Sequence, residues 1–188
     1  MPASMDNLMR TDLTLVKQAA SEADAFGELY QRYNARVYTY HLARTGNIHD
    51  AQDLTSQTFI AALKNIGSYN ARGSFPAWLM GIARHKLVDH YRSRKPLDSL
   101  DQAEQVAGSD PSPEDCLDQN TQLQRIHLAL DTLPPQRAEA LSLRFFAGLK
   151  SIEIASILGI SESAVKMLVY RALQDVRLHL AVELEEKV

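Results

Sequence analysis

The sequence predicts an all-α fold made of two small helical domains joined by a flexible acidic linker. Apolar residues recur at i, i+3 and i+4 in both halves of the chain, as on the buried face of a helix. Ala and Leu are frequent, whereas only 8 Gly and 7 Pro occur among 188 residues, which favours helix. This length suits one domain of usual size or two small ones.

Charge divides the chain into three parts. Residues 1–95 contain 12 Lys or Arg and 8 Asp or Glu, and residues 123–188 contain eight of each kind. Residues 96–122 contain seven acidic residues and no basic ones, together with prolines and serines. A mildly basic half and a neutral half are therefore connected by an acidic segment, which in itself is typical of a solvated tether.

The first half predicts four helices. They are expected from Asp12 to Ala20, from Asp24 to Arg44, from Asp50 to Ile66, and from Pro76 to the basic run 91–96. Gly46 ends the second helix, and Pro76 is tolerated in the first turn of the fourth. In that fourth helix the helical spacing predicts Phe75, Trp78 and Ile82 as core residues.

The second half begins with helical spacing from Thr121, which Leu133-Pro134-Pro135 interrupts. A helix from Pro135 to Ala147 follows, and Gly148 ends it. Residues 151–171 then have the spacing of a helix-turn-helix. Ala155 is small where the two helices cross, Gly159 suits a backbone with positive φ, and Ser161 can cap the second helix.

The second helix of this motif presents polar side chains of the kinds that contact bases and phosphates. The alternative is an ordinary helical hairpin with a glycine stop. The shared core is expected to consist of Ile154, Leu158, Ile160, Val165 and Leu168. The residues that face outward are Glu162, Ser163, Lys166 and Arg171. Arg144 and Lys150 are candidates for further contacts with the phosphate backbone of DNA.

Two further sequence strings precede this motif, Asp-Ala-Gln-Asp-Leu-Thr-Ser-Gln-Thr-Phe at 50–59 and Phe-Pro-Ala-Trp-Leu-Met-Gly-Ile-Ala-Arg at 75–84. With Leu-Asp-Thr-Leu-Pro at 130–134, they closely resemble the bacterial sigma factors of RNA polymerase, in the compact extracytoplasmic-function group. The resemblance covers about residues 24–95 (sigma region 2) and 123–180 (sigma region 4). It implies four parts: an N-terminal segment 1–23, region 2 at 24–95, an acidic linker at 96–122 and region 4 at 123–188.

The resemblance implies a protein that binds core RNA polymerase, through a coiled coil of the largest subunit and through the flap, and that recognises two promoter elements. The third helix would dock on the coiled coil. From the residues alone, its acidic groups also read as ordinary carboxylates at a helix N-terminus. The chain departs from the family pattern in this helix. Gln52 stands where the family usually has Glu, and Ser56-Gln57 stand where it usually has Gln-Glu. The docking residues would be Asp50, Asp53, Leu54, Gln57 and Thr58.

The resemblance also assigns the −10 element to the loop before the fourth helix and to that helix, where aromatic and cationic residues alternate. Such a surface suits a melted strand with an extruded base. His85 stands where the family usually has Asn. The implied −10 residues are Tyr69, Asn70, Arg72, Ser74, Arg84, His85, Lys86, Asp89 and Arg92.

The recognition helix would bind in the major groove of duplex DNA and recognise the −35 element there. Because the C-terminal half carries no net charge, we expect it to bind isolated DNA weakly. The resemblance implies that the acidic linker threads channels of the polymerase instead of acting only as a tether. It also implies an anti-sigma factor as a partner. The implied −35 residues are Ser161, Glu162, Ser163, Lys166 and Arg171.

Two competing interpretations remain. A stand-alone helix-turn-helix regulator would usually add a dimerisation or ligand-sensing domain. A metal enzyme would need a third ligand beside His85 and Asp89, and His90 points away from that pair. We therefore expect no enzyme activity, cofactor or metal. No signal peptide or membrane span is evident, and the lone Cys116 fits a reducing compartment, so a cytoplasmic location is expected.

Overall fold

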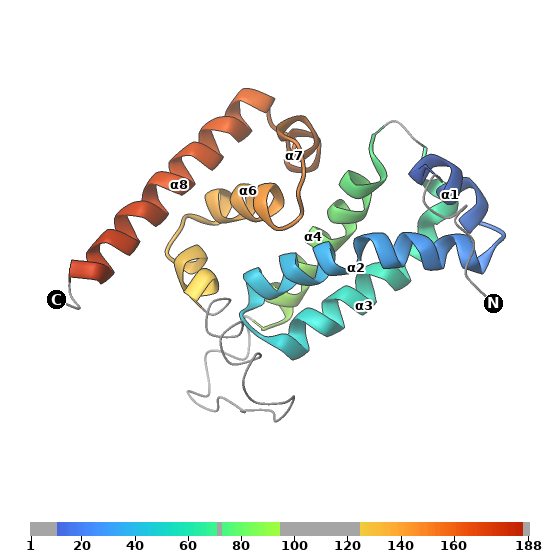
Figure 1. The fold of residues 1–188 in the computed structure, drawn as a ribbon, viewed down its shortest axis with the longest axis horizontal. Coiled ribbons are helices and arrows are strands. Elements are labelled where there is room, and N and C mark those ends of the chain that lie inside the picture. Colours follow the sequence, from blue (N-terminus) through green and yellow to red (C-terminus); the bar gives the residue numbers. More distant parts are fainter. Residues whose placement is uncertain (1–10, 71–72, 95–124, 186–188) are drawn as a thin grey trace, which may run out of the picture.

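The computed structural model describes residues 11–70, 73–94 and 125–185, and within these ranges all regular secondary structure is helical (Figure 1). The predicted all-α fold with two helical halves is therefore confirmed. The predicted linker, with Cys116, lies outside the described residues. The elements are α1 (Asp12–Ala19), α2 (Ala23–Thr45), α3 (Ile48–Asn65), the 3-10 helix η2 (Ile66–Ser68), α4 (Phe75–Arg94), a helix at 125–131, α6 (Pro135–Phe145), α7 (Ser151–Leu158) and α8 (Glu162–Glu185).

The turn between α2 and α3 follows from two residues. Gly46 adopts a left-handed conformation with φ 62°, and its N–H donates to the Leu42 carbonyl at 2.9 Å, which closes α2. Asn47 then caps α3 by accepting a hydrogen bond from the Asp50 N–H at 3.1 Å. Because Asn47 is the cap, α3 begins two residues earlier than the sequence predicted.

Helices α1 to α4 form the N-terminal half around one apolar core. Its largest fully buried apolar side chains include Leu15, Leu29, Val37, Leu54, Leu79 and Leu87. The Arg32 guanidinium contacts Asp12 at 3.0 Å, and the Tyr33 hydroxyl donates to the same carboxylate, so polar contacts attach α1 to α2. This half positions the N-terminal turn of α4 beside the loop that follows η2.

The C-terminal half consists of the helix at 125–131 and of α6, α7 and α8, with α8 extending away from the rest of the molecule (Figure 1). Arg137 on α6 contacts Asp175 on α8 at 2.6 Å. A second apolar cluster joins these helices and includes one residue of α2, Ala43. Its buried members are Ala43, Leu130, Leu133, Ala138, Leu141 and Ala172.

The two halves pack against each other, α6 against α2 and α7 against α4. The larger core cluster runs across this contact, since it includes Leu79 of α4 as well as Ile154 and Val165 of the helix-turn-helix. None of the helices in the described ranges is both long and apolar enough to span a membrane.

His41 makes the stability of the N-terminal half depend on pH. Its ring is fully buried, with Nε2 3.2 Å from the Thr58 hydroxyl. Burial, with a smaller contribution from His90, lowers the pKa of His41 from 6.5 to about 3. The unfolded chain therefore binds the extra proton between these values, so the stabilisation is complete above about pH 6.5 and is lost progressively as pH falls toward 3.

Because of His41, we expect the free energy of unfolding to fall by about 2 kcal/mol when the pH is lowered from 7 to 5. Urea denaturation of the wild type and of His41→Asn at both pH values measures this difference, since the other titrating groups are common to both chains. An equal pH dependence in the two chains would show that His41 is not the cause.

Candidate nucleic-acid and protein-binding surfaces

The helix-turn-helix has the turn that the sequence predicted. Gly159 ends α7 with φ 67°, and its N–H donates to the Ala155 carbonyl. Ser161 caps α8, because its hydroxyl accepts from the Ala164 N–H at 3.2 Å. Ile154 and Val165 are fully buried in the predicted core. The prediction for Ile160 was wrong: this residue is 38 % exposed, because it lies in the turn between the helices.

The outer face of α8 carries the residues predicted for the −35 element. Ser161, Ser163, Lys166 and Arg171 are exposed, and Glu162 is partly buried. Lys166 contacts Glu162, one turn earlier in the helix, at 2.7 Å. If this lysine bound a DNA phosphate, the phosphate would replace the Glu162 carboxylate as its anionic partner. Four of the five predicted residues are therefore accessible to a partner.

Two large residues on α8 were missed at the sequence level. Met167 and Tyr170 are exposed, and the Tyr170 hydroxyl accepts a hydrogen bond from the Gln174 side chain at 3.0 Å. The signal that was available is the helical position of Tyr170, which lies one turn after Lys166 on the same helix.

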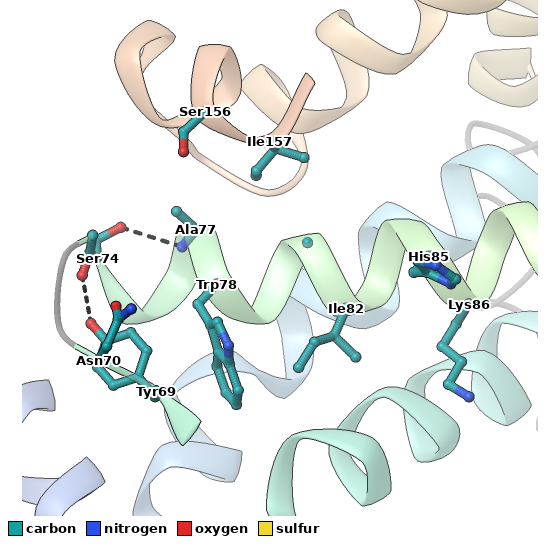
Figure 2. Close-up of a pocket in the computed structure, with 12 residues that line it drawn as sticks. Tyr69, Asn70, Ser74, Ala77, Trp78, Ile82, His85, Lys86, Ser156 and Ile157 are labelled. Carbon is teal, nitrogen blue, oxygen red and sulfur yellow. Dashed lines mark hydrogen bonds between the residues drawn. The ribbon is translucent and has the colours of Figure 1, made fainter. Parts of the chain in front are cut away.

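A pocket of about 600 Å³ lies between the loop that follows η2, the first half of α4, and α7. Figure 2 shows Tyr69 and Trp78 on one side of it, with Ser156 and Ile157 of α7 opposite. His85 and Lys86 line it farther along α4. The pocket therefore combines aromatic surface with a cation, which suits stacking on a base and contact with a phosphate.

Three aromatic rings support this pocket. The centroid of Tyr69 lies 5.5 Å from that of Trp78 and 6.0 Å from that of Phe75. Phe75 is 2 % exposed and confirms its predicted core position. Trp78 and Ile82 pack against the core cluster, as predicted, but they are only partly buried, because they also line the pocket.

The other residues predicted for the −10 element divide into three groups. Asn70 and Ser74 line the pocket with Tyr69, and the Ser74 hydroxyl caps α4 through the Ala77 N–H at 3.3 Å. Asp89 contacts His85 at 3.1 Å, and Arg92 is exposed near the end of α4. Arg84 instead faces the C-terminal half, and Arg72 lies outside the described residues.

The surface predicted to meet polymerase is partly exposed. Asp53 and Gln57 face solvent on α3, and Asp50 lies 3.7 Å from His90 of α4. Leu54 and Thr58 are buried, so they support this helix face from below and present no side chain to a partner. Their burial follows from the i, i+4 spacing that places them toward α2.

Exposed apolar residues extend this α3 surface and were missed from the sequence. Ile60 and Leu63 are about half exposed, at 55 % and 49 %. Tyr30 of α2 is also an exposed aromatic residue, and its ring packs on Phe59 of α3 at 4.7 Å between centroids. Helical spacing from Gln57 to Ile60 was the available signal, but neither apolar residue was assigned a role from the sequence.

The histidines of α4 do not converge on one point. His85 contacts Asp89, whereas His90 turns to Asp50 on α3. Over the part of the chain that the structure describes, no three His, Cys, Asp or Glu side chains are grouped as metal ligands would be.

Comparison with known proteins identifies both halves. The model of Sigma-70 region 2 matches residues 29–96, and that of Sigma-70 region 4 matches residues 123–176. The chain is 39 % identical over 166 residues to the ECF RNA polymerase sigma factor BldN of Streptomyces coelicolor, covering 86 % of this chain and 63 % of BldN. It thus spans less than two thirds of that relative's length.

Similar proteins of matching length are also known. The chain is 26 % identical over 183 residues to the ECF RNA polymerase sigma factor SigW of Bacillus subtilis, which covers 92 % of this chain and 97 % of SigW. The solved structure of CnrH in complex with the cytosolic domain of CnrY has a TM-score of 0.72 and 25 % identity, over 91 % of this chain and 97 % of CnrH. With both sigma regions matched in order, the chain belongs to the extracytoplasmic-function group of the sigma-70 family.

Proposed function

We propose that this protein is a sigma factor that binds core RNA polymerase and directs transcription initiation at promoters with −10 and −35 elements. The observation that carries the proposal is the presence, in one chain, of two surfaces that suit two different forms of DNA. One is the exposed face of α8 in a helix-turn-helix, suited to duplex DNA. The other is the aromatic and cationic pocket beside α4, suited to a single strand.

The domain boundaries follow from the same assignment. Region 2 at 24–95 carries polymerase docking and −10 recognition, and region 4 at 123–188 carries −35 recognition. Residues 1–23 form an N-terminal segment, and the acidic residues 96–122 link the two regions. This division is supported by the two separate family matches.

Polymerase docking is assigned to α3, with Asp53 and Gln57 as direct contacts and Asp50, Leu54 and Thr58 as support. An acidic and apolar helix face is complementary to a basic amphipathic partner. Ile60 and Leu63 enlarge this face, since both are exposed on the same helix. CnrH was solved with the cytosolic domain of CnrY, and we assign an anti-sigma factor to this chain by analogy. The sigma assignment also implies a protein without catalytic activity that works in the cytoplasm.

Docking is tested by gel filtration of the purified chain with core RNA polymerase. We expect the wild type to co-elute with core, and Asp53→Arg to lose most of this association at moderate salt because a charge complementary to the partner is reversed. Asp24→Arg is the matched control, since Asp24 is an exposed acid at the start of α2 and lies outside the docking face. Equal loss in both variants, or no co-elution of the wild type, would contradict the assignment.

Lys166 tests the −35 assignment. We expect Lys166→Ala to weaken holoenzyme binding to promoter DNA about five- to tenfold, and to lower the salt dependence of binding by about one ion. Lys17→Ala removes the same charge from an exposed site on α1 and serves as the control. Filter binding over a range of salt concentrations measures both quantities, and identical slopes for the two variants would remove Lys166 from the DNA surface.

The alternative is a stand-alone helix-turn-helix regulator. It is distinguished by specific duplex binding in the absence of core polymerase. Because residues 123–188 carry no net charge, we expect the free chain to bind duplex DNA weakly, which argues against this alternative.

A further inference from the structure

Helix α1 carries none of the residues assigned above to DNA or to polymerase, yet it packs close to the loop that forms the pocket. It contacts α2 and η2, and η2 leads directly into Tyr69 (Figure 1). Leu15 of α1 is fully buried in the apolar cluster on which Tyr69 and Trp78 also pack. Helix α1 is therefore a structural neighbour of the pocket.

Asp12, the first residue of α1, connects this helix to α2. One of its carboxylate oxygens lies 3.0 Å from Nη1 of Arg32, and the other accepts a hydrogen bond from the Tyr33 hydroxyl. The side chains of Asp12 and Arg32 are 30 % and 29 % exposed, so solvent weakens their ion pair. Tyr33 is only 8 % exposed, so its hydrogen bond to Asp12 is the better protected of the two contacts.

The environment of Tyr33 keeps its hydroxyl protonated and its ring in place. Burial, followed by the hydrogen bond to Asp12, raises the pKa of Tyr33 well above its usual value of 10, so the hydroxyl remains a donor. The guanidinium of Arg36 lies 5.7 Å from the centre of the Tyr33 ring, within the range of a cation–π contact. Tyr33 is thus held at its hydroxyl by α1 and at its ring by its own helix.

Tyr33 in turn contacts the aromatic group of the pocket. Its ring centroid lies 5.4 Å from that of Phe75, the first residue of α4. Phe75 is 2 % exposed, and the centroid of its ring lies 6.0 Å from that of Tyr69 and 5.6 Å from that of Trp78. A continuous series of contacts therefore runs from Asp12 through Tyr33 and Phe75 to the two rings that border the pocket.

Tyr69 depends on these ring contacts for its position relative to α4. Its N–H donates to the Ile66 carbonyl at 3.2 Å, and its hydroxyl donates to the Gly73 carbonyl at 2.5 Å. Both partners are close neighbours along the chain, so these bonds shape the loop but do not attach the ring to α4. Burial and, to a smaller extent, the Asp12 carboxylate raise the pKa of Tyr69, so the charge of Asp12 reaches the pocket.

We propose that Asp12 is a positioning residue for promoter opening, which holds Tyr33 and thereby sets the orientation of the Phe75, Tyr69 and Trp78 rings toward the melted strand. The inference rests on the proposed function, because it concerns the pocket assigned to the −10 strand. A pocket whose rings are already ordered binds a base without the cost of ordering them, so loss of the Asp12 contact weakens capture of the strand. The closed complex, which depends on the helix-turn-helix and duplex DNA, does not require this contact.

The first experiment uses the free, full-length chain, in which Trp78 is the only tryptophan, so that its fluorescence reports on the pocket. We expect Asp12→Ala to shift the emission to longer wavelength and to increase quenching by acrylamide, because the neighbouring rings cover the indole less tightly. Glu28→Ala is the matched control, since it removes the other carboxylate that contacts Arg32 but leaves the bond between Asp12 and Tyr33 intact. Wild-type fluorescence is expected for this control, and circular dichroism establishes that each chain is helical.

The second experiment measures promoter opening by the holoenzyme through permanganate reactivity, and closed-complex formation through filter binding. We expect Asp12→Ala to lower opening about fivefold, the effect of one lost hydrogen bond, with the closed complex unchanged. Asp12→Asn retains an acceptor for the Tyr33 hydroxyl and should restore most of the opening, although it lacks the charge that pairs with Arg32. Tyr33→Phe should match Asp12→Ala, and the double variant should fall no further, because both changes break the same bond.

Wild-type fluorescence or wild-type opening in Asp12→Ala would overturn the proposal. Equal losses of opening and of the closed complex, or failure of Asp12→Asn to recover opening, would also overturn it, because these results describe a role in general stability. Failure of the proposed function is a different result, in which the wild-type holoenzyme opens no promoter. Fluorescence of the free chain would then still show whether Asp12 orders the pocket.

Discussion

Tyr69→Ala is expected to lower promoter opening by the holoenzyme about tenfold or more. The Tyr69 ring is part of the aromatic group with Phe75 and Trp78 that borders the pocket. Stacking of one base on an aromatic side chain contributes about 1–3 kcal/mol, and alanine removes this surface while it also exposes Trp78. The effect should appear in strand separation and not in the initial closed complex.

Permanganate reactivity of the −10 region measures opening, and filter binding of the duplex measures the closed complex. Tyr69→Phe is the matched control. It loses the hydrogen bond from the Tyr69 hydroxyl to the Gly73 carbonyl but retains the ring. Opening close to the wild-type level is therefore expected for Tyr69→Phe. Normal opening with Tyr69→Ala would show that this pocket does not hold the melted strand.

The second large effect is expected for Ile154→Ala in the helix-turn-helix. Ile154 is fully buried between α7 and α8, together with Val165. Truncation to alanine removes apolar contacts and leaves a cavity, at a cost of about 2–5 kcal/mol. Because the recognition helix depends on this small core for its position, initiation at promoters that require a −35 element should be lost.

Ile152→Ala is the matched control, since Ile152 lies in the same helix and is 59 % exposed. Its cost in stability should be within about 0.5 kcal/mol. Hydrogen exchange by mass spectrometry measures the difference locally: α7 and the start of α8 should exchange about 30-fold faster or more in Ile154→Ala, which corresponds to about 2 kcal/mol. Equal exchange in the two variants would contradict the assigned core.

Local features of this fold were predictable because each depends on a few neighbouring residues. Gly159 predicted the left-handed end of α7, and Ser161 predicted the cap of α8; both are confirmed. Helix periodicity located the helices to within a few residues. The start of α3 was placed too late, because Asn47 was not recognised as the cap.

Contacts between the two halves were not predictable in the same way. Glu139 looks like a surface residue in the sequence, since an acid on a helix is usually solvated. It is buried because Tyr40, Arg44 and Arg84, far away in the chain, provide a donor and two positive charges. For the same reason Arg84 was predicted to face DNA alone, whereas in this structure it faces Glu139.

The candidate site was predicted in part. The sequence placed Tyr69, His85 and Lys86 near one another, and all three line one pocket. It treated Trp78 and Ile82 as core, because periodicity identifies an apolar face but not whether a helix or an open pocket lies opposite. On α3, Ile60 and Leu63 were not singled out from the sequence, although both are exposed on the surface proposed to meet polymerase.

Run-off transcription with purified core RNA polymerase and a library of genomic promoter fragments is the decisive test of sigma activity. Transcripts are expected only when this chain and core are both present, from start sites that share a −35 and a −10 element at a fixed spacing. Absence of core-dependent initiation, together with specific duplex binding by the free chain, would instead identify a stand-alone regulator.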